Sequence, residues 1–342
     1  MDKYQMVKLI GEGTYGVVSL GIEKSTGREV AIKKIRKILI NKGVDDGVSF
    51  SAIREIKMLQ ELKHVNVVEL LDVFAHKSNV YLVFELMAWD LQQVIEDRSI
   101  ILKPSDIKSY MKMLLQGIEA CHNNWILHRD LKPNNLLCSA DGDMKLADFG
   151  LARQYGSPHK VYSPQAVTIF YRAPELLFGA KSYGPSVDMW SIGCIFAELM
   201  LRTPYLPGTS EIDQLTKIFS ALGTPNETVW PGVTSLPNYI QFTDFPATPF
   251  AQLFSAASPD AIDLLQKMLT YNPAARCSAT EALAHPYFSN SPKPSAPKDL
   301  PKPSKPSTTI DMNPQINNNN NNNNTSNNTN LNQLFNSQST KY

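Results

Sequence analysis

The sequence predicts an α+β protein built from two lobes of different character. Up to about residue 86, apolar residues alternate with glycines and charged residues, for example at 7–10 and 80–84, which is the pattern of β-strands. From about Ser105 onward, apolar residues recur at every third or fourth position, which is typical of helices. We therefore expect a small, strand-rich N-terminal lobe and a larger, mainly α-helical C-terminal lobe.

In the N-terminal lobe, short strands are predicted at 7–10, 16–18, 29–32 and 80–84. Turn residues at 25–27 separate the second strand from the third. Between the third and fourth strands, residues 50–62 carry apolar side chains at helical spacing, from Ile53 to Leu62, and Ser49 or Ser51 is available as the N-cap. One helix is therefore expected to interrupt one small sheet.

The C-terminal lobe begins with a helix whose apolar face runs from Ile107 to Ile118, and further helices are predicted at about 186–200 and 260–269. After residue 288 the composition changes to prolines and lysines, and then to a run of asparagines at 317–324. Such a segment cannot bury a core. We expect a folded domain over 1–288, divided at about 86 into two lobes, and a disordered tail over 289–342.

The composition excludes several classes of protein. The formal net charge is +1, from 33 basic and 32 acidic residues, and it provides no field for direct nucleic-acid binding. The longest apolar stretch, 190–201, contains Glu198 and is too short to cross a membrane, and no leader opens the chain. The four cysteines form no CxxC pair, which argues against a metal centre or a disulfide framework and favours a reducing, intracellular compartment.

A glycine-rich segment, GEGTYG, occupies residues 11–16. Glycines at this spacing let backbone amides approach a phosphate in two settings, a Rossmann turn that opens a helix or a hairpin that covers a nucleotide. Because Gly16 runs into a strand, we favour the hairpin. The residues expected around the nucleotide here are Ile10, Gly11, Glu12, Gly13, Thr14, Tyr15, Gly16, Val17 and Val18.

Three further segments carry the candidate chemistry. Lys33, in Ala31-Ile32-Lys33, is expected to reach nucleotide phosphates and to pair with Glu55 of the following helix. In HRDLKPNN, Asp130 would orient an acceptor hydroxyl and take its proton, while Lys132 would neutralise charge on the transferred phosphoryl group. The amide of Asn135 and the carboxylate of Asp148, in DFG, offer the hard oxygen ligands that Mg²⁺ prefers.

In this order and spacing, with Ala173-Pro174-Glu175 further on, these segments resemble those of the eukaryotic protein kinases. The resemblance implies the bilobal kinase fold, a Ser/Thr kinase activity and ATP with Mg²⁺ as cofactors. Phe84 would lie behind the adenine, and Glu85 and Met87 would belong to the hinge that binds it. His128 and Asp188 would support the catalytic loop. A pseudokinase scaffold is the non-enzyme alternative, and the intact catalytic residues argue against it.

The segment between Asp148 and Glu175 contains two Ser-Pro sites, at Ser157 and Ser163. Arginine forks pair bidentately with phosphate, and Arg54, Arg129 and Arg153 are the arginines expected to converge on such a group. We expect phosphorylation of Ser163 to order this segment and raise activity. Two further candidate phosphorylation sites, Thr14 and Tyr15, lie in the glycine-rich segment, where a phosphate would block the nucleotide.

Over residues 1–290 the chain resembles the cyclin-dependent kinases, and more specifically the catalytic subunit of the CDK-activating kinase (CAK) of general transcription factor II H. The likeness lies in HKSNVYLVFELM, WILHRDLKPNNLL, APELLFGAKSYG and YFSN. It implies a cyclin H-like cyclin and a RING-finger assembly factor as partners, the nucleus as location, and activation segments of cyclin-dependent kinases and the heptad-repeat tail of RNA polymerase II as substrates.

Several positions depart from that pattern. The cyclin-binding segment at 49–55 differs in its first three residues, Arg153 replaces a lysine, and Ser163-Pro164 stands where Thr-His is usual. Ile169-Phe170 likewise replaces Arg-Trp, and the Asn-rich tail lacks a basic end. A cell-cycle kinase that acts directly on Ser/Thr-Pro sites is therefore the alternative among enzymes.

Overall fold

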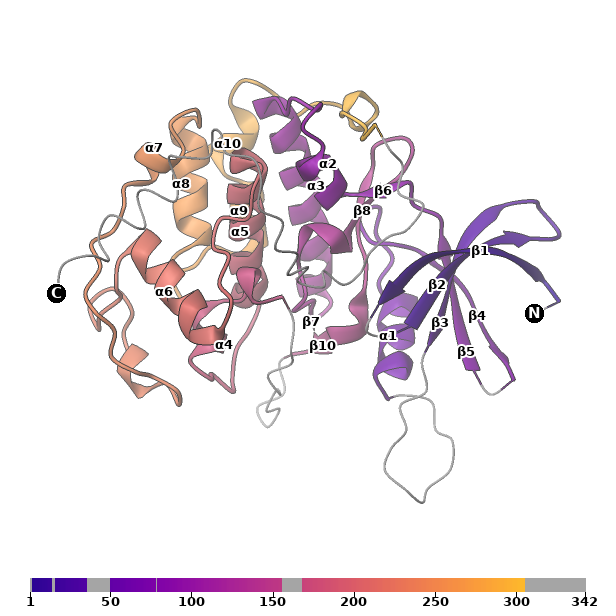
Figure 1. The fold of residues 1–342 in the computed structure, drawn as a ribbon, viewed down its shortest axis with the longest axis horizontal. Coiled ribbons are helices and arrows are strands. Elements are labelled where there is room, and N and C mark those ends of the chain that lie inside the picture. Colours follow the sequence, from indigo (N-terminus) through magenta and orange to yellow (C-terminus); the bar gives the residue numbers. More distant parts are fainter. Residues whose placement is uncertain (1, 14–15, 36–49, 78, 156–167, 305–342) are drawn as a thin grey trace, which may run out of the picture.

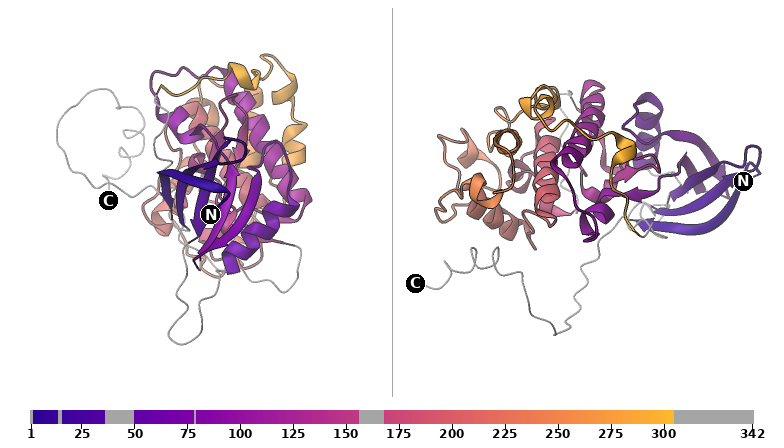
Figure 2. Two further views of the ribbon diagram at one scale, coloured as in Figure 1. Left: turned by 90° about the vertical axis from the view of Figure 1, so that its right-hand side faces the viewer. Right: turned by 90° about the horizontal axis from the view of Figure 1, so that it is seen from above.

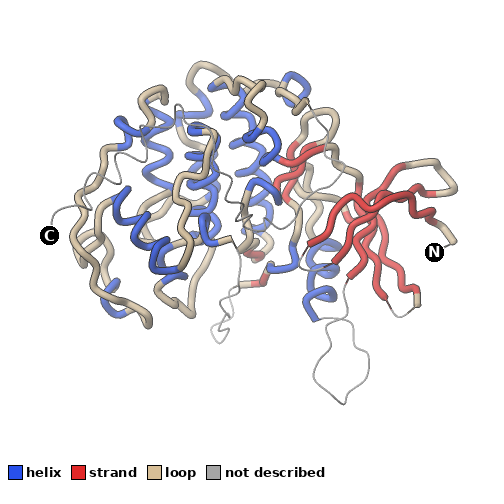
Figure 3. The backbone as a smooth tube through the Cα atoms, in the orientation of Figure 1, coloured by secondary structure: helices blue, strands red, loops and turns tan. Residues whose placement is uncertain are grey.

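A computed structural model of the chain describes residues 2–13, 16–35, 50–77, 79–155 and 168–304, with only the backbone at 50–54. Figure 3 shows the strands gathered at one end of the molecule and most of the helices at the other. The N-terminal lobe is a five-stranded antiparallel sheet in the order β1-β2-β3-β5-β4. Its strands are β1 (Tyr4–Gly13), β2 (Gly16–Glu23), β3 (Glu29–Ile35), β4 (Leu70–His76) and β5 (Asn79–Glu85).

The register of the sheet places the first functional side chain. Val18 of β2 lies opposite Lys33 of β3, and Lys33 in turn lies opposite Leu82 of β5. The central strand is thus paired on both sides, so that Lys33 has a fixed backbone position. Gly16 must be glycine, because a Cβ there would meet the carbonyl oxygen of Lys34 at 2.1 Å. The helix α1 (Phe50–Glu61) lies beside this sheet (Figure 1).

The C-terminal lobe is mainly helical, as the sequence predicted. Its α-helices are α2 (Leu91–Glu96), α3 (Pro104–Asn123), α4 (Pro174–Leu177), α5 (Ser186–Leu201), α6 (Glu211–Leu222), α7 (Phe250–Leu253), α8 (Pro259–Met268), α9 (Ala279–Leu283) and α10 (Pro286–Ser289). Two small sheets are made of short strands. In one, β8 (Leu136–Cys138) pairs with β6 (Trp89–Asp90) on one side and with β9 (Met144–Leu146) on the other; in the second, β7 (Ile126–Leu127) pairs with β10 (Arg153–Gln154). The 3₁₀ turns are η1 (Pro133–Asn135), η2 (Phe149–Leu151), η3 (Ile169–Tyr171), η4 (Val233–Ser235) and η5 (Pro297–Asp299).

The helix α5 forms the centre of this lobe. It is buried along almost its whole length, and Trp190, Ile195 and Phe196 are fully inaccessible. Burial on every side explains why 190–201 reads as a continuous apolar stretch rather than as a periodic one. Within the described parts of the chain, no helix combines the length and apolar character that a bilayer span requires.

The sequence predicted a disordered tail from residue 289 onward, and this prediction is wrong for residues 289–304. Residues 289–304 are described, and Leu300 in the middle of them is 4% exposed. In Figures 1 and 2 this yellow segment follows α10 and runs across the C-terminal lobe toward the N-terminal lobe. Composition alone suggested disorder, but an extended proline-rich chain can bind to a surface that is already folded. The Asn-rich run at 317–324 lies outside the described residues.

Candidate active site

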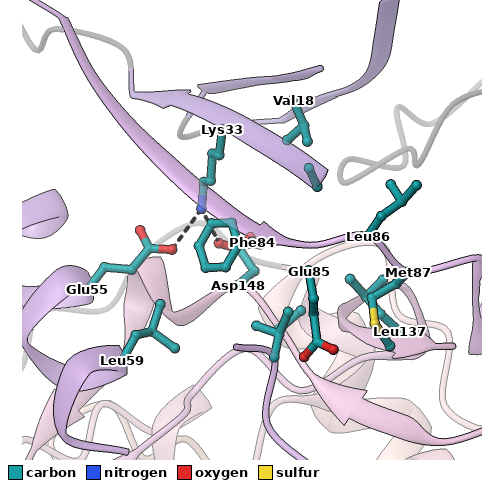
Figure 4. Close-up of a pocket in the computed structure, with 13 residues that line it drawn as sticks. Val18, Lys33, Glu55, Leu59, Phe84, Glu85, Leu86, Met87, Leu137 and Asp148 are labelled. Atoms are coloured by element: carbon teal, nitrogen blue, oxygen red, sulfur yellow. Dashed lines mark hydrogen bonds and ion pairs between the residues drawn. The ribbon is translucent and has the colours of Figure 1, made fainter. Parts of the chain in front are cut away.

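A buried lysine joins the two lobes across the cleft (Figure 4). The ammonium of Lys33 on β3 lies 2.9 Å from Oε1 of Glu55 on α1 and 3.1 Å from Oδ1 of Asp148, which precedes η2. The predicted ion pair between Lys33 and Glu55 is therefore present. All three side chains are at most 7% exposed, so the charges interact with little screening by water.

The electrostatics of this cluster follow from two carboxylates that share one ammonium. Burial disfavours the charged lysine, but Asp148 and Glu55 outweigh it and raise the pKa of Lys33. For Asp148, burial works against ionisation, yet Lys33 holds its pKa below the usual value. Burial, aided by the Asp148 charge, raises the pKa of Glu55. Asp148 therefore remains ionised, as a cation-binding carboxylate must.

A pocket opens beside this cluster, between the sheet and the C-terminal lobe. Of the residues expected around the nucleotide, Val18, Ala31, Lys33, Glu55, Phe84, Glu85 and Met87 line it. Ile10, Gly11, Glu12, Gly16 and Val17 lie in β1 and β2 but are not among its lining residues. Gly13 ends β1, and Thr14 and Tyr15 lie outside the described residues. The remaining walls are mostly aliphatic, and they suit a flat, weakly polar ring system.

Other lining residues escaped the sequence analysis as nucleotide contacts. Val68, Leu137 and Ala147 face the pocket from the loop before β4, from β8 and from the segment after β9. Nothing in the sequence distinguishes these apolar residues from ordinary core residues. The carboxylate of Glu85 accepts from Lys145 at 2.7 and 2.9 Å and from the amide of Glu69 at 2.8 Å, which ties the hinge to β9.

The floor of the cleft is held by the side chain of Asp188, at the start of α5. Its Oδ2 accepts from the amide of His128 at 3.0 Å, and its Oδ1 accepts from the amide of Arg129 at 2.8 Å. The ring of His122 also contacts Oδ2 at 3.0 Å. Burial opposes the charge on Asp188, but these hydrogen bonds and the nearby histidines lower its pKa. The left-handed backbone of Arg129, with φ of 67°, is therefore fixed from two sides.

His128 fills the space beneath the loop, as expected from the sequence. Its Nε2 lies 3.0 Å from the carbonyl oxygen of Ala147, and its ring meets the edge of Phe149 at a centroid distance of 4.9 Å. Phe149 is 1% exposed, and Leu59 of α1 is 4% exposed in the same core cluster. An apolar column thus supports Asp148, whose own backbone is left-handed with φ of 60°.

The three remaining catalytic candidates converge beside this column. The side-chain Nδ2 of Asn135 donates to the carbonyl oxygen of Asp130 at 2.7 Å and to its Oδ2 at 3.0 Å. The ammonium of Lys132 lies 3.3 Å from the same Oδ2. Within the described residues, Oδ1 of Asp130 and Oδ1 of Asn135 are buried and have no hydrogen-bond partner. Burial, with the Asp148 charge, raises the pKa of Asp130 despite Lys132.

These orphaned oxygens fit the expected ligands of the reaction. A buried acceptor without a partner is costly unless something else binds it. Asn135 Oδ1 suits Mg²⁺, with Asp148 as the carboxylate, and Asp130 Oδ1 suits the proton of an acceptor hydroxyl. Among the residues that the structure describes, no three His, Cys, Asp or Glu side chains cluster into a metal cage. That is compatible with Mg²⁺, which takes few protein ligands and completes its shell with phosphate and water.

Two of the three predicted phosphate-binding arginines come together. Nε of Arg129 donates to the carbonyl oxygen of Leu151 at 2.8 Å, and Nη1 of Arg153 lies 3.4 Å from the same oxygen. Arg129 also donates to the hydroxyl of Tyr183 at 2.8 Å, a contact that the sequence analysis missed. The side chain of Arg54 and both serines, Ser157 and Ser163, lie outside the described residues.

A fold with this cleft, a buried lysine shared by two carboxylates, and an aspartate beside an asparagine and a lysine define a phosphotransferase of the protein kinase class. The family model described as "Protein kinase domain" matches residues 4–288, which is most of the chain, so the chain belongs to the protein kinase family. As a member, it takes ATP as the phosphoryl donor.

Relatives narrow the class further. The chain is 78% identical to "Cyclin-dependent kinase 7" of Dictyostelium discoideum over 303 residues, which cover 89% of this chain and 84% of that one. It is 54% identical to "Cyclin-dependent kinase 7" of Xenopus laevis over 88% of this chain and 86% of that one. "Serine/threonine-protein kinase KIN28" of Saccharomyces cerevisiae is 50% identical over 90% of this chain and 97% of that one.

A solved structure agrees with these relatives. A chain of the CAK complex from Chaetomium thermophilum, bound to ATP-γ-S, matches with a TM-score of 0.81 at 43% identity. The match covers 87% of this chain and 94% of that chain. The chain is accordingly a cyclin-dependent protein serine/threonine kinase of the CAK type, as the sequence analysis predicted.

Proposed function

We propose that this kinase phosphorylates the activation segments of other cyclin-dependent kinases and the C-terminal heptad repeats of RNA polymerase II. The similarity to a chain of a CAK complex carries the proposal, because the catalytic residues themselves do not determine which polypeptide is bound.

In the proposed reaction, Lys33 orients the phosphates of ATP, and Glu55 holds Lys33 in place at 2.9 Å. Asn135 and Asp148 would hold Mg²⁺, and the bound ion would neutralise charge on the phosphates. The carboxylate of Asp130 aims the acceptor hydroxyl and takes its proton, and its raised pKa favours that transfer. Lys132, which lies 3.3 Å from Asp130, stabilises the negative charge of the phosphoryl group as it passes from ATP to the acceptor hydroxyl oxygen.

The same proposal includes the partners and the location. A cyclin H-like cyclin and a RING-finger assembly factor would join the chain in transcription factor II H, in the nucleus. A cyclin bound to α1 would hold this helix in the position in which Glu55 pairs with Lys33, as it does here at 2.9 Å. We expect the isolated, unphosphorylated chain to have low activity.

Reconstitution tests the proposal. The chain is purified alone and with the two partner subunits, and phosphate transfer is measured to a kinase-inactive cyclin-dependent kinase and to a heptad-repeat peptide. We expect transfer to both, strongly increased by the partners and strongly reduced in Asp148→Asn with complex formation retained. Transfer only to general Ser/Thr-Pro peptides, together with capture of mitotic cyclins alone, would instead indicate a cell-cycle kinase. Binding without any transfer would indicate a scaffold.

Regulation by Ser163 is part of this proposal. Arg129 and Arg153 already share the carbonyl oxygen of Leu151, so that a phosphate nearby would meet two guanidinium groups. Ser163→Ala, assayed with partners bound, should reduce turnover of at least one substrate class, and Ser157→Ala tests the second Ser-Pro candidate separately. Full activity of Ser163→Ala toward every substrate would exclude this role.

A further inference from the structure

The segment after α10 binds the C-terminal lobe through specific contacts rather than by composition. We call residues 290–304 the C-terminal strap. At its start, the ammonium of Lys108 on α3 donates to the carbonyl oxygens of Asn290 and Pro292 at 3.0 and 2.7 Å. Ser295 then donates through its hydroxyl to Oδ1 of Asp106 at 2.6 Å and through its amide to the carbonyl oxygen of Ser105 at 3.0 Å.

The second half of the strap lies against the turn between β8 and β9. Leu300 is buried in the main core, and the ammonium of Lys302 donates to the carbonyl oxygen of Ala140 at 2.7 Å. The same ammonium lies 6.0 Å from the ring centroid of Trp89, next to the hinge. Gly142 in the turn is so close to the strap that a Cβ would meet the carbonyl oxygen of Pro297 at 1.9 Å.

The strap ends, in the described part of the chain, at a serine bound to one carboxylate. Ser304 is exposed, and both its amide and its hydroxyl donate to Oδ2 of Asp97 at 2.8 Å. The other oxygen of Asp97 accepts from the amide and hydroxyl of Ser99, at 2.9 and 2.6 Å. These hydrogen bonds, first among them the one from the amide of Ser304, lower the pKa of Asp97, so that it stays ionised at neutral pH.

We propose that Ser304 is a phosphorylation site and that its phosphate releases the end of the strap from Asp97. In the transfer, Ser304 Oγ forms a bond to the γ-phosphorus of ATP, the bond from that phosphorus to the β,γ-bridging oxygen breaks, and ADP leaves. The hydroxyl proton passes to the catalytic base of the modifying kinase. The product lacks the O–H donor and sets a phosphate of about −2 charge against an ionised carboxylate, which is the disruptive arrangement for this modification.

The surroundings of Ser304 also indicate which class of kinase would act. Lys302 precedes it by two residues and Lys305 follows it, whereas no proline occupies the next position. A proline-directed kinase is therefore excluded, and a kinase with acidic groups in its peptide groove is favoured. Access requires only that the end of the strap opens locally, because Ser304 is exposed and belongs to no helix or strand.

Release would affect the catalytic residues through the hairpin that the strap contacts. Asn135 directly precedes β8, and Asp148 follows β9 by two residues, so both proposed Mg²⁺ ligands are carried by the far ends of this hairpin. Lys302 and Pro297 contact its turn. Release that extends from Ser304 back to Lys302 would loosen a contact on the turn of this hairpin, independently of the substrates proposed above.

Hydrogen exchange of the full chain tests whether phosphorylation releases Ser304 from Asp97. Phosphoserine is incorporated at position 304 during translation, and the exchange rate of the Ser304 amide is compared with that of the unmodified chain. We expect at least ~10-fold faster exchange, since a hydrogen bond to a charged group contributes roughly that factor. Phosphoserine at Ser289 is the matched control: this residue is also exposed, but its hydroxyl contacts the carbonyl oxygen of Pro286 rather than a carboxylate.

A second substitution identifies the cause. In Asp97→Asn the phosphate should have a several-fold smaller effect on exchange, because the repulsion is gone. Unchanged or slower exchange in the phosphorylated chain would overturn the proposal, since it would mean that the phosphate binds Arg98 or Lys302 instead. An effect of equal size in Asp97→Asn would also overturn it. Mass spectrometry of the chain purified from its own cells with phosphatase inhibitors should find phosphate on Ser304, and its absence would refute a physiological role.

Discussion

The upper wall and the floor, which are the two walls of the cleft, are positioned by different kinds of contact. In the upper wall, Lys33 meets Glu55 and Asp148 through side-chain ion pairs that bring together β3, α1 and the start of η2. In the floor, Asp188 accepts hydrogen bonds from the backbone amides of His128 and Arg129. Ion pairs between separate elements form or break when a helix moves, whereas a backbone fixed on a buried carboxylate does not adjust. Regulation should therefore act on the upper wall, and the floor should be constant.

The largest effect on activity should come from Asp148, the residue of the upper wall that is also a proposed Mg²⁺ ligand. Asp148→Asn removes a charge from the proposed Mg²⁺ site and from the partner of Lys33. We expect kcat/KM to fall by roughly 10³-fold, equivalent to about 4 kcal/mol of transition-state stabilisation. Steady-state kinetics with partner subunits bound measures this, with thermal unfolding as the control for folding. Activity within tenfold of the wild type would contradict the assignment.

Changing the floor should destabilise the protein as well as inactivate it. Asp188→Asn replaces a buried carboxylate by an amide whose NH₂ group would face the donors of His128 or Arg129. Leaving buried donors unsatisfied should lower the free energy of unfolding by about 3 kcal/mol. Denaturant titration of the isolated chain measures the loss. A variant as stable as the wild type would show that the floor does not depend on this carboxylate.

Changing the upper wall should affect activity with little loss of stability. Glu55→Gln keeps an acceptor for Lys33 but removes a charge, and we expect kcat/KM to fall by roughly 10- to 30-fold, about 2 kcal/mol. The unfolding midpoint should change little, because burial already raises the pKa of Glu55 and disfavours its charge. If Glu55→Gln were destabilised as strongly as Asp188→Asn, the contrast between the two walls would be incorrect.

A second carboxylate on α5 sharpens the comparison. Glu198 is fully buried but accepts one hydrogen bond, from Tyr171 at 2.7 Å, and within the described residues its Oε1 has no partner. Burial raises the pKa of Glu198 to about 7. The folded protein therefore binds a proton that the unfolded chain releases above a pH of about 4.5, and stability should fall as pH rises from about 5 to 8.

The size of this effect follows from the shift. We expect a loss of about 2 kcal/mol over that interval, and none from this position in Glu198→Gln. Unfolding measured at pH 5, 6.5 and 8 for both proteins gives the difference. Parallel pH profiles would show that Glu198 is ionised in the folded state.

The chemistry of the cleft could be predicted from the sequence, because Lys33, Asp130, Asn135 and Asp148 lie in short segments whose spacing is set by catalysis. The ion pair between Lys33 and Glu55 was predicted for the same reason, and it is present. The apolar walls could not be assigned, since Val68 and Leu137 look like any buried aliphatic residue. Their role depends on where the lobes meet, and local sequence does not encode that position.

The strap shows a second limit. Composition describes what a segment can bury by itself, and residues 289–304 can bury little. Their order comes from Lys108, Asp106 and Asp97, which are supplied by α3 and by the residue that follows α2. Each of these partners is distant in sequence, and none would be singled out as a docking residue by its own surroundings. Contacts with the folded lobe therefore order residues 289–304, although their composition by itself favours disorder.

The burial of all four cysteines has a practical consequence. Cys121, Cys138, Cys194 and Cys277 are free thiols in the interior, and burial raises the pKa even of the least enclosed, Cys277, to about 11. Thiolates are the reactive species toward alkylating reagents, so the native chain should label slowly with maleimides. A single cysteine introduced at an exposed position such as Lys298 would then be the one fast-reacting thiol. A fluorophore attached there would report strap opening in real time without a cysteine-free background.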